Sequence, residues 1–179
     1  MDTSPLASES TRLWQAAVSL AARVHAGQWR KDGCTPYVAH PMRVALTVRQ
    51  VFGCDDVTAL VIALLHDTIE DTLIDYDDLR EQFGVAVAEG VACLTKDKRL
   101  PQEQREAAFY EQIARGSWQA RLVKLADAHD NLCDAATPAA RRQAVGKARR
   151  ALAAAGDDPR LAGACQILRE LIAQAEAEP

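Results

Sequence analysis

The chain has 179 residues, enough for one domain with a substantial core, and its hydrophobic content of 49% excludes a largely disordered protein. Aromatic residues make up only 5%, while alanine and leucine are abundant, so the composition favours helices over sheet. The net charge of −4 argues against a general basic surface for nucleic acid or an acidic membrane.

The five cysteines indicate the compartment. They stand at positions 34, 54, 93, 133 and 165, include no C-x-x-C pair and are odd in number, so we expect reduced thiols and a cytoplasmic protein. The first residues lack the basic and apolar regions of a signal peptide, and no apolar run is long enough to span a membrane.

The chain in order predicts an irregular start at residues 1–8 and then only helices joined by loops. Serine, aspartate and proline mark their starts, and glycine marks several ends. The expected helices span about residues 8–26, 41–52, 56–72, 75–83, 85–94, 101–115, 117–131, 138–156 and 161–175. No strand-like alternation persists, so we predict an all-α fold, irregular rather than a regular four-helix bundle, in a single domain over 1–179.

The first charged cluster follows a continuous apolar run that ends at Leu65. His66 and Asp67 come next, and Glu70 and Asp71 follow one turn later. On one continuous helix, residues four apart stack, so the four polar side chains would share a face. Carboxylates crowded at the end of a buried segment repel one another without a cation, which points to a divalent metal ion.

A metal site needs donors from elsewhere in the chain. His40, just before Pro41, and Asp127, at the end of a Leu-Val-Lys-Leu-Ala-Asp segment, are the candidates. Imidazoles with carboxylates suit Mn²⁺, Fe²⁺ or Zn²⁺, and the lack of thiolates favours a hydrolytic ion. The alternatives are a histidine hydrogen-bonded in the core, an aspartate that only caps its helix and a solvated acidic face.

The loop at residues 27–40 carries Arg30 and Lys31 beside Trp29 and Tyr37. Cations next to aromatic rings suit the binding of phosphate and stacking on a base. An ordinary solvated loop, in which the two rings serve hydrophobic packing, fits the same composition.

Together these segments resemble the HD phosphohydrolase superfamily, in the version of the RelA/SpoT-type guanosine polyphosphate hydrolases and their small stand-alone members. The resemblance covers about residues 12–135, which leaves 136–179 as a helical C-terminal extension. Five blocks carry it in order: Arg30-Lys31-Asp32-Gly33 with Pro36-Tyr37, His40-Pro41 with Val44-Ala45, Ala63 to Asp67 with Thr68 to Thr72, Phe83-Gly84 with Leu94-Thr95-Lys96, and Val123 to Asp127 with Asn131-Leu132.

The resemblance implies roles for individual residues. The ligands of one Mn²⁺ would be His40, His66, Asp67 and Asp127. The residues that orient and activate the attacking water would be Glu70 and Asp71. The substrate-binding residues would be Arg30 and Lys31 in the nucleotide pocket and Asn131 near the ribose, and we add Lys98 and Arg105 as candidates for the remaining phosphates.

The implied reaction removes pyrophosphate from the 3′ position of guanosine tetra- or pentaphosphate (ppGpp in the stringent response) and leaves GDP or GTP. We expect a hydrolase without a synthetase domain, whose partner is a small-molecule nucleotide rather than nucleic acid or a membrane. Assembly as a homo-oligomer stays open.

Two stretches depart from the family pattern. Ala128-His129-Asp130 and Cys133-Asp134 stand where basic residues are common, so two cations are lost and two acids gained. Unless these side chains point away, their charge would weaken binding of a tetraphosphate, although His129 could donate to a phosphate. Two alternatives therefore stay open: a phosphohydrolase of another nucleotide or phosphorylated cofactor, and a non-catalytic nucleotide-binding module.

Overall fold

The computed structural model describes residues 8–177, so the irregular start expected at residues 1–8 lies almost entirely outside the described range. Within that range the regular elements are helices, and extended backbone pairs only in an isolated bridge between Trp29 and Pro36. The all-α prediction is confirmed. The elements are α1 (Glu9–Val24), α2 (Ala39–Leu46), the π-helical turn η1 (Thr47–Val51), α3 (Val57–Leu65), α4 (Thr68–Asp71), α5 (Tyr76–Phe83), α6 (Val85–Cys93), α7 (Gln102–Arg115), α8 (Trp118–Cys133), α9 (Pro138–Ala155), the 3₁₀ turn η2 (Pro159–Leu161) and α10 (Ala162–Ala177).

Side-chain caps begin several of these helices where the sequence predicts them. The hydroxyl of Ser8 caps α1, the carboxylate of Asp56 caps α3 and the hydroxyl of Ser117 caps α8, each by accepting a backbone N–H of the first turn. Gly84, at φ 86°, separates α5 from α6 in a conformation that other residues rarely adopt. α8 runs two residues beyond its expected end, to Cys133.

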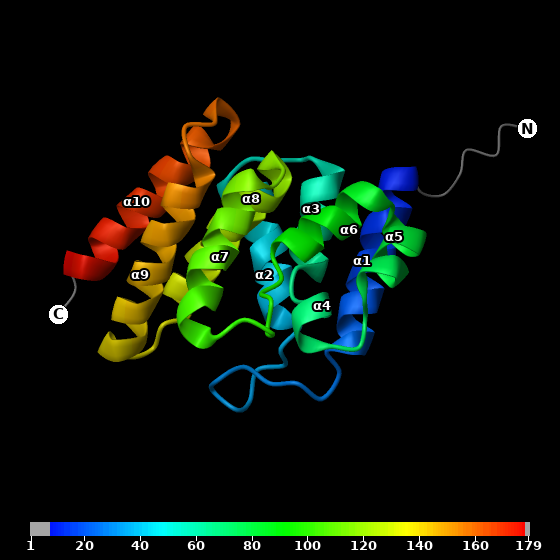
Figure 1. Ribbon diagram of the computed structural model, residues 1–179, viewed down its shortest axis with the longest axis horizontal. Helices are drawn as coiled ribbons and strands as arrows, with labels where there is room; N and C mark the ends of the chain where they lie inside the picture. Colours follow the sequence, from blue (N-terminus) through cyan, green and yellow to red (C-terminus); the bar gives the residue numbers. More distant parts are fainter. Residues whose placement is uncertain (1–7, 178–179) are drawn as a thin grey trace, which may run out of the picture.

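Helix α3 lies at the centre of the core. Its residues from Ala59 to Leu65 are all buried, and it packs against α1, α2, α6 and α8. Burial of a large apolar side chain is worth about 1.5–3 kcal/mol, so this helix anchors the residues that follow it. Figure 1 shows α9 and α10 as a pair on one side of the molecule, beside α8, and α1 and α5 on the other side.

The helix expected over residues 56–72 is interrupted, which corrects the prediction of one continuous face. α3 ends at Leu65, His66 and Asp67 form a turn, and α4 begins at Thr68. The Thr68 hydroxyl donates to the Leu65 carbonyl at 2.7 Å, so a side chain satisfies this acceptor at the break. His66 and Asp67 therefore stand at a corner, where both side chains can turn toward neighbouring helices.

Helix α2 begins two residues before Pro41, which was expected at the first helical position. The N–H groups of Ala39 and His40 donate to the carbonyls of Pro36 and Tyr37, and these bonds draw both residues into the helical end of the loop. Pro41 stays within the first turn, where its missing N–H costs no hydrogen bond. His40 is thereby fixed on a helix instead of a loop.

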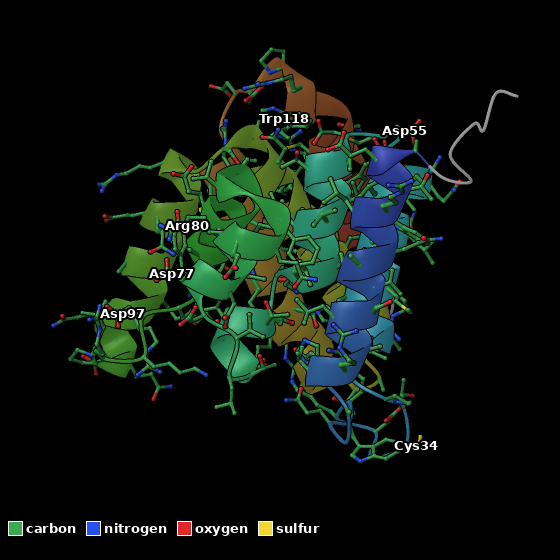
Figure 2. The ribbon with its side chains drawn as sticks, turned by 90° about the vertical axis from the view of Figure 1, so that its right-hand side faces the viewer. Cys34, Asp55, Asp77, Arg80, Asp97 and Trp118 are labelled. Atoms are coloured by element: carbon green, nitrogen blue, oxygen red, sulfur yellow. The ribbon has the colours of Figure 1, made fainter. Side chains whose placement is uncertain are left out.

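The loop between α1 and α2 is closed by Asp32, whose carboxylate accepts the N–H groups of Cys34 and Thr35 at 2.9 Å. Cys34 marks the tip of this loop in Figure 2, at the opposite end of the molecule from Trp118. Across the described residues, no helix combines the length and the apolarity needed to cross a membrane.

Candidate metal centre

Three parts of the fold bring two histidines and two aspartates together. His40 comes from α2, His66 and Asp67 from the turn between α3 and α4, and Asp127 from α8. Nε2 of His40 lies 3.2 Å from Oδ1 of Asp127 and 3.7 Å from Oδ2 of Asp67. Nε2 of His66 lies 3.1 Å from Oδ2 of Asp67 and 3.9 Å from Oδ1 of Asp127. We call these four residues the ligand cluster.

The orientation of His66 suits a metal ligand. Its Nδ1 lies 2.8 Å from the Ala63 carbonyl oxygen, an acceptor, so Nδ1 donates there and Nε2 is left facing the cluster. This Nε2 is buried and has no hydrogen-bond partner, a situation that costs about 1–3 kcal/mol unless something else binds it. Metal–ligand bonds of about 2.0–2.2 Å place neighbouring donors roughly 3 Å apart. The donor atoms of His40, His66 and Asp67 all lie within 4.8 Å of one another, and Asp127 approaches this group through His40.

The carboxylate of Asp130 orients His40 through Nδ1, the ring nitrogen that does not face the ligand cluster. Nδ1 of His40 lies 2.7 Å from Oδ2 of Asp130, and Nε of Arg43 donates to the other oxygen of Asp130 at 2.7 Å. Burial alone would lower the pKa of His40, but hydrogen bonds with Asp127 and Asp130 raise it to about 9. The surrounding carboxylates therefore stabilise positive charge at this point, which is the electrostatic requirement for a cation site.

Both aspartates of the ligand cluster are held as anions. Burial would raise the pKa of Asp67, but the neighbouring His66 keeps it well below its usual range. Burial would likewise raise the pKa of Asp127, but Lys124, His40 and His66 together keep it well below its usual range. Nζ of Lys124 donates to Oδ2 of Asp127 at 2.7 Å, while Asn131 donates to the same side chain.

Glu70 and Asp71 do not stack on His66 and Asp67, because the helix is broken between the two pairs. They nevertheless line the same cavity as the ligand cluster. Oε2 of Glu70 accepts the N–H of Lys96 at 3.1 Å, which fixes its carboxylate. The hydroxyl of Tyr37 donates to Oδ2 of Asp67 at 2.6 Å and lies 3.4 Å from Oδ2 of Asp71.

The cavity has a volume of about 210 Å³. Arg30, Tyr37 and Asn131, three residues of the family-like segments, line it together with the ligand cluster. Six further residues line it that were not among the expected site residues: Leu94, Lys96, Phe109, Tyr110, Lys124 and Lys147.

The five expected substrate-binding residues divide into two groups. Arg30 and Asn131 line the cavity and are hydrogen-bonded to each other at 3.3 Å. Lys31 lies on the exposed turn of the loop, outside the cavity. Nζ of Lys98 donates to the Glu70 carbonyl, and the Arg105 guanidinium donates to backbone carbonyls at the start of α7, so neither lines the cavity.

The acids that depart from the family pattern are turned away from the cavity. Asp130 is buried and engaged by His40 and Arg43, and Asp134 forms an ion pair with Arg30 at 2.7 Å. His129 does not line the cavity either, since its ring packs edge-on against Phe52. Neither acid lines the cavity, and arginines neutralise both: Arg43 pairs with Asp130, and Arg30, which does line the cavity, pairs with Asp134.

The two aromatic residues of the loop differ in their surroundings. Trp29 is 57% exposed, so the expectation that it packs in an apolar environment is wrong. Tyr37 is partly buried and supports the ligand cluster through its hydroxyl, and Arg30 lies over its ring at 5.8 Å. Nothing in the local sequence distinguishes the two roles, because both depend on which side of the loop faces α3 and α4.

Comparison with known proteins relates this site to a family. The model of the HD domain family matches residues 17–169. The guanosine-3′,5′-bis(diphosphate) 3′-pyrophosphohydrolase MESH1 of Homo sapiens is 43% identical over 130 residues, which cover 72% of this chain and 72% of the relative. A bacterial relative of the same enzyme name, from Aquifex aeolicus (strain VF5), is 36% identical over 121 residues, 66% of this chain but only 17% of the relative.

Comparison with solved structures gives matches of the same kind as the comparison of sequences. A metazoan orthologue of SpoT, described as hydrolysing ppGpp and acting in starvation responses, superposes with a TM-score of 0.80 and 29% identity over 96% of this chain and 98% of that one. The protein lmo0812 from Listeria monocytogenes EGD-e superposes with a TM-score of 0.60 and 26% identity over 78% of this chain and 94% of that one. With its fold, its His-Asp cluster and these matches, the chain belongs to the HD domain family.

Proposed function

We propose that the protein hydrolyses the 3′-diphosphate of guanosine tetra- and pentaphosphate, releasing pyrophosphate and leaving GDP or GTP. The observation that carries the proposal is a complete ligand cluster in one cavity with Glu70 and Asp71. The relatives that bear the name of this reaction, at up to 43% identity, support the choice of substrate. We assign the activity to the cytoplasm and to a small-molecule nucleotide as partner.

The ion in this proposal is a single Mn²⁺, with Fe²⁺ and Zn²⁺ as alternatives that the same donors accept. His40, His66, Asp67 and Asp127 would hold it. When bound, such an ion supplies Lewis acidity toward water and phosphoryl oxygens. Tyr37 and Lys124 keep the two aspartates in place, since each donates a hydrogen bond to one of them.

The protein's own groups then carry the proton transfer. Glu70 or Asp71 orients a water molecule and accepts its proton as the water attacks the phosphorus next to the ribose 3′ oxygen. The bond from that phosphorus to the 3′ oxygen breaks, its electron pair goes to the oxygen, and the oxygen takes up a proton. Asn131 and Arg30 lie in the cavity lining, where they would hold the ribose and the nucleotide.

Product analysis tests the proposal. Purified protein with Mn²⁺ is expected to convert guanosine tetraphosphate to GDP and pyrophosphate in equal amounts, resolved by ion-exchange chromatography. His66→Ala should give neither product. Intact wild-type protein that holds its metal and releases orthophosphate, or nothing, would refute the proposed reaction.

The two alternative functions have less support. Another nucleotide substrate was suggested by acids at positions 130 and 134, but neither acid lines the cavity and both are paired with arginines. A non-catalytic module would not need Glu70 and Asp71 beside a complete ligand cluster.

A further inference from the structure

One part of the cavity wall is formed by lysines from three separate segments. Lys96 follows α6, Lys124 lies on α8 and Lys147 lies on α9, and all three line the cavity. We call them the lysine wall. Lys147 belongs to the helical C-terminal extension, for which a solvated face, a partner surface and a pocket wall all fit the sequence.

Lys124 connects the lysine wall to the ligand cluster. Its ammonium group binds Asp127 at 2.7 Å and lies 5.1 Å from the centre of the Phe109 ring. The ammonium group of Lys96 lies 5.2 Å from the centre of the same ring. The wall therefore begins beside one of the metal ligands and continues around Phe109, away from the cluster.

Lys147 adds a positive charge that the protein does not balance. In the part of the chain that the structure describes, no carboxylate forms an ion pair with it. Burial lowers its pKa, and the charges of Lys96 and Lys124 lower it further. Glu106 and Asp127 are the acids whose charge raises this pKa, but Glu106 is already paired with Lys96 at 2.9 Å and with Arg150 at 3.3 Å, and Asp127 with Lys124 at 2.7 Å. Lys96 and Lys124 are each paired with a carboxylate, so Lys147 is the cation of the lysine wall that has no ion-pair partner among the described residues and is suited to bind an anion.

Packing fixes Lys147 in this position. The hydroxyl of Tyr110, on α7, donates to the Lys147 carbonyl at 3.4 Å, and α9 packs against both α7 and α8. Lys147 itself is exposed, so its side chain can reach a ligand in the cavity without being required for the core.

We propose that Lys147, with Lys96, binds the outer phosphate of the 3′-diphosphate and thereby selects a diphosphate over a single phosphate at the 3′ position. This inference rests on the proposed function. A phosphate held at the ligand cluster has the lysine wall beside it, so the second phosphate of a diphosphate meets these ammonium groups. A 3′-monophosphate occupies the cluster alone and leaves Lys147 without a ligand.

The test compares two nucleotides that differ only in the outer 3′ phosphate: guanosine 5′-diphosphate 3′-diphosphate and guanosine 5′-diphosphate 3′-monophosphate. Dissociation constants are measured by calorimetry with Mn²⁺ in a Glu70→Gln background, which stops turnover. Lys147→Gln is expected to weaken binding of the 3′-diphosphate about tenfold, the loss of one charge-assisted hydrogen bond, and to leave the 3′-monophosphate unchanged. Lys147→Arg should retain most of the preference.

The control is Arg142→Gln, a charge removed from the same helix at an exposed position outside the cavity, which should change neither constant. Equal weakening of both nucleotides by Lys147→Gln, or no weakening, would overturn the inference. The measurement does not depend on turnover. Wild-type protein that binds both nucleotides and hydrolyses neither would refute the proposed function while leaving this comparison intact.

Discussion

The ligand cluster and the lysine wall share one cavity, but they are built in opposite ways. In the cluster, His40, His66 and Asp127 are buried, and every carboxylate has a donor that keeps it charged. In the wall, Lys147 is exposed and has no ion-pair partner among the described residues. The cluster combines two carboxylates and two imidazoles that are suited to a cation, and the wall is a set of ammonium groups that is suited to an anion.

We infer from this difference that the ligand cluster serves the reaction and that the lysine wall determines which phosphate compound binds. A buried and fully supported site tolerates little change, because removing one member leaves a charge or a polar atom unpaired. A rim lysine without a partner can be exchanged at little cost to the fold, so it can alter which phosphate compound fits. Changes in the cluster should therefore affect every substrate, and changes in the wall only some of them.

The largest effect is expected from Asp67→Ala, which removes a proposed metal ligand and the acceptor of the Tyr37 hydroxyl. Without it the Lewis acid is lost, so turnover should fall by about 10³-fold or more. Metal content measured by atomic emission should fall in parallel. Retention of both metal and activity would exclude Asp67 from the cluster.

The substitution Glu70→Gln should have the next largest effect on turnover. The amide keeps the size of the side chain and still accepts the N–H of Lys96, but it cannot take a proton. Turnover is expected to fall about 10²-fold, with metal content unchanged. If Glu70→Gln is fully active while Asp71→Asn is not, the base is Asp71.

Asp130→Asn tests the support behind His40. The amide cannot carry the charge that holds the imidazole and Arg43, so affinity for the ion should fall by about 10- to 100-fold. Competition with a fluorescent chelator measures it. Asp134→Asn is the matched control on the same helix end, since Asp134 binds Arg30 and Arg43 but not His40. Equal loss in both variants would contradict a specific role for Asp130.

The smallest effect is a dependence of stability on pH in chelator-treated protein. The pKa of His40 is raised from 6.5 to about 9, so the folded state binds its proton more tightly than the unfolded state does. Its contribution to stability is complete below about pH 6.5 and is lost as the pH rises through about 9. Thermal unfolding should therefore shift to lower temperature across this range, and His40→Gln should flatten the slope. An equally steep slope in the variant would assign the effect to other groups.

The two regions also differ in how far the sequence predicted them. His66 and Asp67 follow a long apolar run, and His40 and Asp127 lie at the ends of apolar segments, so local pattern marks all four. The break after Leu65 was missed because it depends on the Thr68 hydroxyl, which donates to the Leu65 carbonyl. The helical pattern of residues 60–72 does not show whether this carbonyl accepts a side-chain hydroxyl or the backbone N–H of a continuing helix. The error changed the expected stacking but not the set of residues.

Lys147 could not have been found in the same way. Its neighbours in sequence, from Arg141 to Arg150, form an alternation of alanine and basic residues typical of a solvated helix face. Only the packing of α9 against α7 and α8 turns it toward the cavity. Lys124 had a usable signal, since it stands three residues before Asp127 on a predicted helix, within reach of a side-chain pair.

Metal-dependent pyrophosphate release tests the central claim most directly. Chelator-treated protein is titrated with Mn²⁺ while pyrophosphate release from guanosine tetraphosphate is followed. The account predicts no turnover at the start, a linear rise and a plateau at one ion per chain, with no plateau in Asp67→Ala. Full turnover in the chelated protein, or none at one bound ion per chain, would contradict it.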